Sequence, residues 1–244
     1  MPGKIFHNGG FIIQKPSNEK NMKTKLWMMS ALVALVAAAA LQSCNDDDDN
    51  RNLAYPNALV TLKTNASGTF FLQLDDSTTV IPTNMKASPY GKKEVRALAN
   101  INMDAKEPKD HVKSGYVNWL DSILTKNMAP NLGDKNDATY GNDPVELVKD
   151  WTTLVEDGYL TLRFRTYFGY GKRHVLNLIS TGKPYEVELR HNAQGDDRRV
   201  VRDGLVAFRL IGLPDTGGKE EELTVKWKSF SGEKSAKFKY RTRR

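Results

Sequence analysis

The sequence predicts an all-β protein in which a small OB-like five-stranded barrel is followed by an immunoglobulin-like antiparallel β-sandwich. Short apolar runs alternate with clusters of Gly, Pro, Asn and Asp along most of the chain, as strands alternate with turns. Within these runs apolar and polar residues alternate with a period of two, which is typical of strands with one buried face. A turn-rich segment near the middle divides the runs into two groups, and the length suits two ordinary domains.

The chain begins with the layout of a lipoprotein signal peptide. Residues 26–41 contain no charge, follow Lys23 and Lys25, and lead to the single cysteine, Cys44. A basic start, an apolar core and a cleavage region form a secretory signal, and this core is shorter than the ~20 residues that span a bilayer. We therefore expect cleavage before Cys44 and attachment of lipid to its thiol. The residues expected to guide the peptidase are Leu41, Gln42 and Ser43.

This interpretation excludes the N-terminal residues from the folded part. Residues 1–21 precede a natural start at Met22 and are interpreted as an over-extended start, residues 22–43 as the signal peptide, and residues 44–56 as a lipidated tether. An uncleaved interfacial helix is the alternative for the apolar run. The excluded residues hold five lysines against one glutamate, which is more than half of the formal net charge of +7. The remaining excess is small, so we expect no nucleic-acid partner.

An acidic run follows the cysteine directly and consists of Asp46, Asp47, Asp48 and Asp49. We interpret it as an export signal that sends the lipoprotein to the outer face of the outer membrane, exposed at the cell surface. A solvated spacer is one alternative, because blocks of like charge repel one another and extend. A cation site is the other, but metal-binding loops space their ligands and place a glycine where the backbone turns. The run has neither feature.

The first folded domain is expected over residues 57–126. The fourth of its strands places small apolar residues on one face, which suits a tight barrel, and the fifth is apolar on both faces, as in a strand covered on both sides. Five short strands favour a closed barrel of the OB type. The strands are predicted at residues 58–63, 69–74, 80–81, 94–103 and 116–124.

The second domain is expected over residues 144–244, after a linker at residues 127–143 that is rich in Asn, Asp and Gly. Leu160, Leu162 and Phe164 share one phase of a strand. About seven short strands of this kind predict a β-sandwich whose two inner faces share one core. Helix is expected at most as a turn at residues 145–148. Further alternating runs lie around residues 176–178, 187–189, 206–210, 223–227 and 236–240.

Several segments together resemble the NigD-like lipoproteins. They are the Cys44 tether with its aspartates, FFLQLDD at residues 70–76, Asp157-Gly158-Tyr159-Leu160 at the start of a long strand, and the strand at residues 184–191. The resemblance implies an OB-like domain followed by a β-sandwich, in agreement with the strand pattern. It also implies a link to bacteriocin action or immunity. Its motifs are scaffold residues, so it implies no catalytic signature.

No enzymatic chemistry is indicated by the motifs. His111, His174 and His191 are scattered, and neither HExxH nor GxSxG occurs. With Cys44 bound to lipid, the rest of the chain has no thiol for catalysis, for a disulfide or for a cysteine-based metal site. We therefore expect no catalytic residue, no metal and no cofactor, and each histidine is interpreted as a solvated or structural residue.

A candidate ligand face is predicted on the barrel, because OB folds hold ligands around their second and third strands by stacking. Phe71 is out of phase with its apolar neighbours and is expected to point outward beside Gln73, with Arg96 nearby. The alternative is that the second domain covers Phe71, since large exposed aromatic residues are uncommon.

Two functional hypotheses follow. The first is a noncatalytic binding or protective module, anchored to the membrane by its lipid, whose partner is a glycan, an envelope protein or a bacteriocin. The second is a structural or accessory subunit of an outer-membrane protein complex. Retention of a free ligand favours the first hypothesis, and co-purification with an envelope complex favours the second.

Overall fold

The computed structural model describes residues 53–104, 111–169, 171–196 and 200–243. The chain divides into two compact units, Met1–Asp48 and Asp49–Arg244, and every described residue belongs to the second unit. The predicted signal peptide, the lipidation site Cys44 and the acidic run at residues 46–49 lie outside the described residues. Neither described helix has the length and apolar character needed to cross a membrane.

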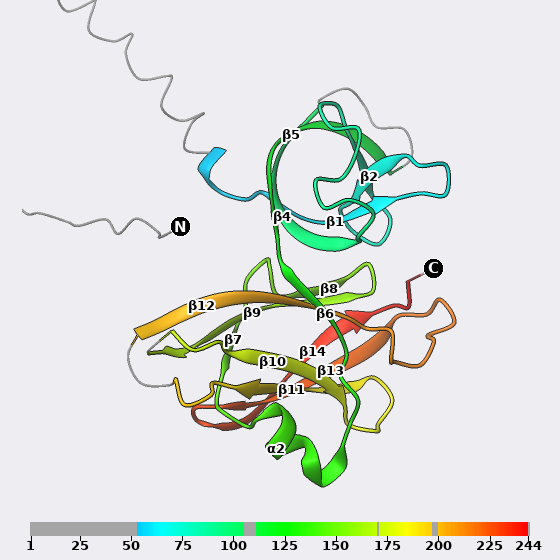
Figure 1. The fold of residues 1–244 in the computed structure, drawn as a ribbon. Coiled ribbons are helices and arrows are strands. Elements are labelled where there is room, and N and C mark those ends of the chain that lie inside the picture. Colours follow the sequence, from blue (N-terminus) through cyan, green and yellow to red (C-terminus); the bar gives the residue numbers. More distant parts are fainter. Residues whose placement is uncertain (1–52, 105–110, 170, 197–199, 244) are drawn as a thin grey trace, which may run out of the picture. The chain divides into compact units, whose positions relative to one another are not determined.

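The first domain is the closed five-stranded barrel that the sequence predicts (Figure 1). Its strands follow the order β1-β2-β3-β5-β4 and then return to β1. All neighbours are antiparallel except β3 and β5, which run parallel. The interior is filled by aliphatic residues that include Ala97 and Ala99 of β4, as the small residues of this run predict. The bounds are β1 Ala58–Thr64, β2 Phe70–Gln73, β3 Thr79–Pro82, β4 Val95–Met103 and β5 Val112–Ser122.

The second domain is the predicted β-sandwich, made of two sheets around one core (Figure 1). One sheet has the order β6-β12-β9-β7, with β8 also paired to β9, and the other has the order β10-β11-β13-β14. Leu160, Leu162 and Phe164 face this core, so the phase read from the sequence is confirmed. The bounds are β6 Leu124–Asn127, β7 Glu146–Val148, β8 Leu154–Glu156, β9 Tyr159–Phe168, β10 Val175–Ser180, β11 Glu186–Asn192, β12 Val200–Arg209, β13 Glu221–Ser229 and β14 Gly232–Tyr240.

Two strand pairs of the sandwich are parallel, whereas the sequence pattern predicts an antiparallel arrangement throughout. The parallel pairs are β6 with β12 and β11 with β13. Between β11 and β13 the chain crosses to the other sheet to form β12, so β11 and β13 run in the same direction. Alternation along a strand reports which face is buried and carries no information about the direction of its neighbour.

The predicted linker at residues 127–143 is part of the sandwich. Its first residue ends β6, and the segment then forms a short 3₁₀ helix, η1 Gly133–Lys135, and a helix, α2 Asn136–Tyr140. The Ala129 N–H donates to the Leu178 carbonyl at 2.8 Å, and the buried Tyr140 donates to the Pro130 carbonyl at 2.9 Å. The domain boundary therefore precedes residue 124, and the helical turn expected at residues 145–148 is the strand β7.

Candidate functional site

The outer face of the barrel packs against the sandwich through an apolar cluster. Leu59 of β1 and Ile123 meet Tyr159 of β9 and Ala207 of β12, and all four are buried. Leu98, Leu154 and Leu205 surround them. Strands that would otherwise expose one face to water are buried on both faces here. Burial of this apolar area stabilises the contact between the domains by ~25 cal/mol for each Å² removed from water.

Tyr159 is the polar centre of this contact. Its hydroxyl donates to Oε1 of Glu94 and accepts from Nε of Arg209 at 3.1 Å. Arg243 binds the same glutamate with two hydrogen bonds of 2.6 and 2.8 Å. The guanidinium carbons of Arg96, Arg209 and Arg243 lie 5.5–6.0 Å from the centroid of the tyrosine ring. This is the range of a cation–π contact.

The electrostatics of the contact favour a neutral tyrosine and an ionised glutamate. Burial and the hydrogen bond to Glu94 raise the pKa of Tyr159 to about 12. Burial alone would raise the pKa of Glu94, but the hydrogen bonds from Arg243 and Tyr159 hold that pKa below its usual value. The Tyr159 hydroxyl therefore keeps its proton and donates a hydrogen bond to a carboxylate. Such charge-assisted hydrogen bonds are strong.

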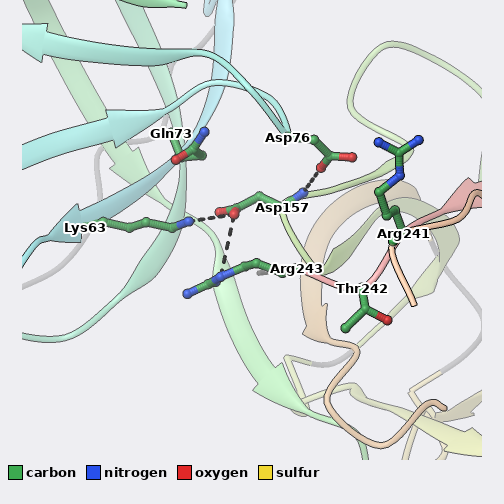
Figure 2. Close-up of a pocket in the computed structure, with 8 residues that line it drawn as sticks. Lys63, Gln73, Asp76, Asp157, Arg241, Thr242 and Arg243 are labelled. Carbon is green, nitrogen blue, oxygen red and sulfur yellow. Dashed lines mark hydrogen bonds and ion pairs between the residues drawn. The ribbon is translucent and has the colours of Figure 1, made fainter. Parts of the chain in front are cut away.

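A cleft of about 320 Å³ opens beside this contact and is lined by both domains (Figure 2). We call it the interdomain cleft. The Lys63 ammonium lies 2.5 Å from Oδ1 of the buried Asp157, and the Asp157 N–H donates to Oδ1 of Asp76 at 2.6 Å. The lining residues are Lys63, Gln73 and Asp76 of the barrel and Asp157, Gly218, Arg241, Thr242 and Arg243 of the sandwich.

The turn between β8 and β9 places Asp157 in this cleft. Asp157 and Gly158 have φ values of 49° and 73°, as in the two-residue hairpin turn for which Asp-Gly is a preferred sequence. A Cβ at Gly158 would lie 3.0 Å from the Cβ of Arg243, so glycine also allows the C-terminal segment to pass closely. The sequence predicts the turn. The interaction of the Asp157 carboxylate with Lys63 could not be predicted from the local sequence, because the two residues are 94 positions apart.

The cleft retains polar groups that the fold does not use. Arg241 is exposed at its rim and has no ion-pair partner among the described residues. Oδ2 of Asp157 is buried and accepts no hydrogen bond from them. The described lining has no Cys or His, and its one hydroxyl, that of Thr242, accepts from the Thr216 N–H at 2.9 Å. Its donors and acceptors suit the binding of a polar ligand.

The structure places the three residues of the predicted ligand face differently from one another. Phe71 and Gln73 are half-buried on β2, and Gln73 lines the interdomain cleft. Arg96 is fully buried on β4, donates to Oγ1 of Thr61 at 2.9 Å and lies 3.6 Å from Glu156. The expectation that Arg96 belongs to an exposed face is therefore corrected. Its outward phase directs it to the sandwich, which covers this side of the barrel.

Two of the histidines that are scattered in the sequence form a buried pair. Nδ1 of His174 lies 2.9 Å from Nε2 of His191, whose Nδ1 lies 3.2 Å from the Pro144 carbonyl. Nε2 of His174 lies 3.0 Å from the Asp196 carbonyl. The Asp196 carboxylate lies 3.7 Å from Nε2 of His174.

His111 is exposed and takes no part in the histidine pair. Within the ranges that the structure describes, no three His, Cys, Asp or Glu side chains are grouped to hold a metal ion. The histidine pair supports the packing of the sandwich, since it joins the start of β10 to β11 and to the residues before β7.

Comparison with known protein families identifies both domains. Residues 59–123 match the NigD-like N-terminal OB domain, and residues 127–240 match the NigD-like C-terminal beta sandwich domain. The second match begins within the segment that the sequence pattern suggests is a linker. No curated protein matches the chain.

Solved structures share this two-domain architecture. A candidate toxin-related protein from Parabacteroides distasonis is 34% identical over 75% of this chain and 92% of its own, with a TM-score of 0.63. A NigD-like immunity protein from Bacteroides caccae is 19% identical over 75% and 95%, with a TM-score of 0.53. A candidate lipoprotein from Bacteroides fragilis is 15% identical over 76% and 99%, with a TM-score of 0.52.

Proposed function

Because this chain belongs to the NigD-like family, we propose that it is a noncatalytic binding lipoprotein of the cell envelope whose ligand occupies the interdomain cleft. The single observation that carries this proposal is the set of oriented charges in the cleft. Lys63 and Asp76 come from the barrel, and Asp157 and Arg241 come from the sandwich. Ligand sites occur preferentially at interfaces between domains, and both domains line this cleft.

The ligand is expected to present an acceptor group to Arg241. This guanidinium is at the rim and is not engaged in an ion pair among the described residues, so it can bind a carboxylate, a phosphate or a hydroxyl oxygen. Lys63 and Arg243 are already engaged by Asp157 and Glu94, so Arg241 is the lining cation that a ligand can bind.

Location and partner follow from other observations. The signal peptide, Cys44 and the acidic run support a lipid anchor in the outer membrane with the folded domains outside the cell, and one solved structure of the same fold is described as a candidate lipoprotein. The partner class we favour is a bacteriocin or another exported peptide. The supporting observations are the toxin-related and immunity descriptions of two solved structures that share this fold.

The proposal is tested by substitution of the free arginine. The purified lipoprotein is screened against bacteriocin peptides, envelope polysaccharides and envelope proteins, and the affinity of the retained probe is measured by biolayer interferometry. Arg241→Ala is expected to weaken this affinity roughly tenfold or more, because a hydrogen bond to a charged group contributes ~1.5–3 kcal/mol.

Arg202→Ala is the matched control, since Arg202 is exposed on β12 and does not line the cleft. Equal affinities for the wild type and Arg241→Ala would contradict the placement of the ligand in the cleft. If no probe is retained but the protein co-purifies with an envelope complex after mild crosslinking, the accessory-subunit hypothesis is supported instead.

A further inference from the structure

A second cavity, of about 390 Å³, lies where the barrel meets the sandwich and shares no lining residue with the interdomain cleft. We call it the Trp151 groove. Its apolar wall is formed by Pro56 and Leu98 of the barrel and by Trp151 and Leu205 of the sandwich. The volume is in the range of small-molecule sites, which is ~300–1,000 Å³.

Trp151 lines the groove and is 48% exposed. The loop that carries it is fixed by local hydrogen bonds: Oδ1 of Asp150 accepts from the Thr152 N–H at 2.9 Å and from the Thr152 hydroxyl at 2.6 Å. The Thr153 hydroxyl donates to the Val148 carbonyl at 2.6 Å and accepts from the Arg163 N–H at 3.0 Å. A large aromatic side chain is therefore presented to solvent on a braced turn rather than on a loose loop.

A network of ionised groups lies beside Trp151, and three of them, Asp150, Arg163 and Asp203, line the groove with it. Arg163 donates to Oδ2 of Asp150 at 2.6 Å and to Oδ2 of Asp203 at 2.5 and 2.8 Å. Arg165 donates to Oδ1 of Asp203 at 2.6 Å. The hydrogen bonds from Arg165 and Arg163 lower the pKa of Asp203 to about 2. Two carboxylates and two guanidinium groups leave this network without net charge.

We propose that the Trp151 groove binds a neutral saccharide. A sugar ring has an apolar face of C–H groups, which can stack on the indole, and an edge of hydroxyls, each of which both donates and accepts hydrogen bonds. The carboxylates and guanidinium groups at the rim match this edge. Because the network is neutral, an ionic ligand would gain little from it. An apolar peptide or a lipid chain would cover these ions without replacing their hydration, which is costly.

This inference goes beyond the proposed function, since it concerns another site and another ligand class. The test uses the purified full-length lipoprotein and defined probes, namely neutral trisaccharides of glucose, mannose, galactose, xylose and N-acetylglucosamine, with tri-galacturonic acid as the charged comparison. Binding is measured by isothermal titration calorimetry. At least one neutral probe is expected to bind, with affinity at least tenfold lower in Trp151→Ala and less reduced in Trp151→Phe.

Two controls separate this site from other effects. Tyr116→Ala removes an aromatic side chain that is 53% exposed on the barrel and is expected to leave saccharide affinity unchanged. Arg241→Ala is expected to leave it unchanged as well, so the outcome does not depend on the interdomain cleft. Thermal unfolding confirms that each variant folds. The proposal is overturned if no neutral probe binds, if Trp151→Ala binds as the wild type does, or if tri-galacturonic acid is preferred.

Discussion

Arg96 shows how a single residue in this protein depends on partners distant in sequence. Its side chain is fully buried, and its Nε and Nη2 atoms have no hydrogen-bond partner among the described residues. Burial lowers its pKa, while Glu156 and the Tyr159 ring favour the charged form. A buried cation contributes little to stability by itself but strongly disfavours arrangements that leave it unpaired. We infer that Arg96 serves the specificity of the domain contact.

The histidine pair yields a pH prediction. Burial and the charge of His174 lower the pKa of His191 in the folded protein. The unfolded chain, with an ordinary histidine pKa of about 6.5, then binds more protons than the folded protein below that pH. The free energy of unfolding is therefore expected to fall as the pH is lowered from 7.5 through 6.5. Replacement by His191→Gln should reduce this slope, which for one proton is at most ~1.4 kcal/mol per pH unit.

Urea unfolding of the wild type and variants at several pH values measures this effect. His111→Gln is the control, because His111 is exposed and lies outside the pair. If His191→Gln and the wild type lose stability in parallel between pH 7.5 and 5.5, the pair does not contribute to the pH dependence.

At the scale of an element, the segment at residues 127–143 shows why composition can mislead. Its Asn and Asp side chains satisfy backbone and neighbouring groups: Asn131 accepts from the Gly133 N–H at 2.9 Å, and Asn136 accepts from the Leu132 N–H at 2.9 Å. Arg190 of β11 donates to Asp137 and, at 3.0 Å, to the Gly141 carbonyl. Residues that usually form mobile connections therefore hold a helix on the sandwich.

Two glycines in this segment provide a matched pair of variants. Gly141 has φ 77°, and a Cβ there would lie 2.5 Å from the His191 carbonyl oxygen. Gly133 has φ 59° but open space around the same position. Both alanine variants incur a cost of ~1–3 kcal/mol because alanine rarely adopts a positive φ. Gly141→Ala is expected to lose a further ~1–3 kcal/mol because of overpacking.

The free energies of unfolding in urea measure the difference between the two variants. A packed segment predicts that Gly141→Ala is clearly less stable than Gly133→Ala. Equal stabilities would mean that residues 127–143 behave as the solvated linker that their composition suggests.

At the scale of the whole molecule, hydrogen bonds and ion pairs connect the two domains, and each domain contributes both carboxylates and cations or donors to them. Glu94 of the barrel accepts hydrogen bonds from three residues of the sandwich. Its carboxylate binds Tyr159 and Arg243, and its backbone carbonyl binds Arg209. In return, Lys63 of the barrel pairs with Asp157 of the sandwich. Such reciprocal pairing fixes the orientation of the partners more than it adds affinity.

Substitutions of Cys44 and of the acidic run test the predicted location of the protein in the cell envelope. The wild type is expected to incorporate labelled palmitate and to be cut by protease added to intact cells. Cys44→Ala should lose the label and leave the membrane fraction, because a protein without its acyl chains has no stable anchor. Replacement of residues 46–49 by alanine should keep the label but protect the protein from external protease.

Cys44→Ser is the conservative control for the thiol and should behave as Cys44→Ala does. An intact N-terminal leader and an unmodified Cys44 in the mass spectrum of the purified wild-type protein would contradict the lipoprotein assignment. Cleavage of the variant without the acidic run at the wild-type rate would contradict only the export signal.

The sequence by itself determined the fold class, the five barrel strands and the inward phase of the sandwich strands, because alternation and turn chemistry are local properties of the chain. The Asp157-Gly158 turn was equally predictable from its two residues. The lipid anchor stays a prediction of the sequence, since Cys44 lies outside the described residues.

The tertiary structure decided what the outward side chains face. Side chains on the outer face of the barrel do not all meet water. Arg96 is buried under the sandwich, and Gln73 lines the interdomain cleft. The tertiary structure also pairs Lys63 with Asp157 and His174 with His191, and it places Leu98 in the wall of the Trp151 groove. These contacts connect residues far apart along the chain, so their free energy depends on the packing of whole sheets, and no local pattern records it.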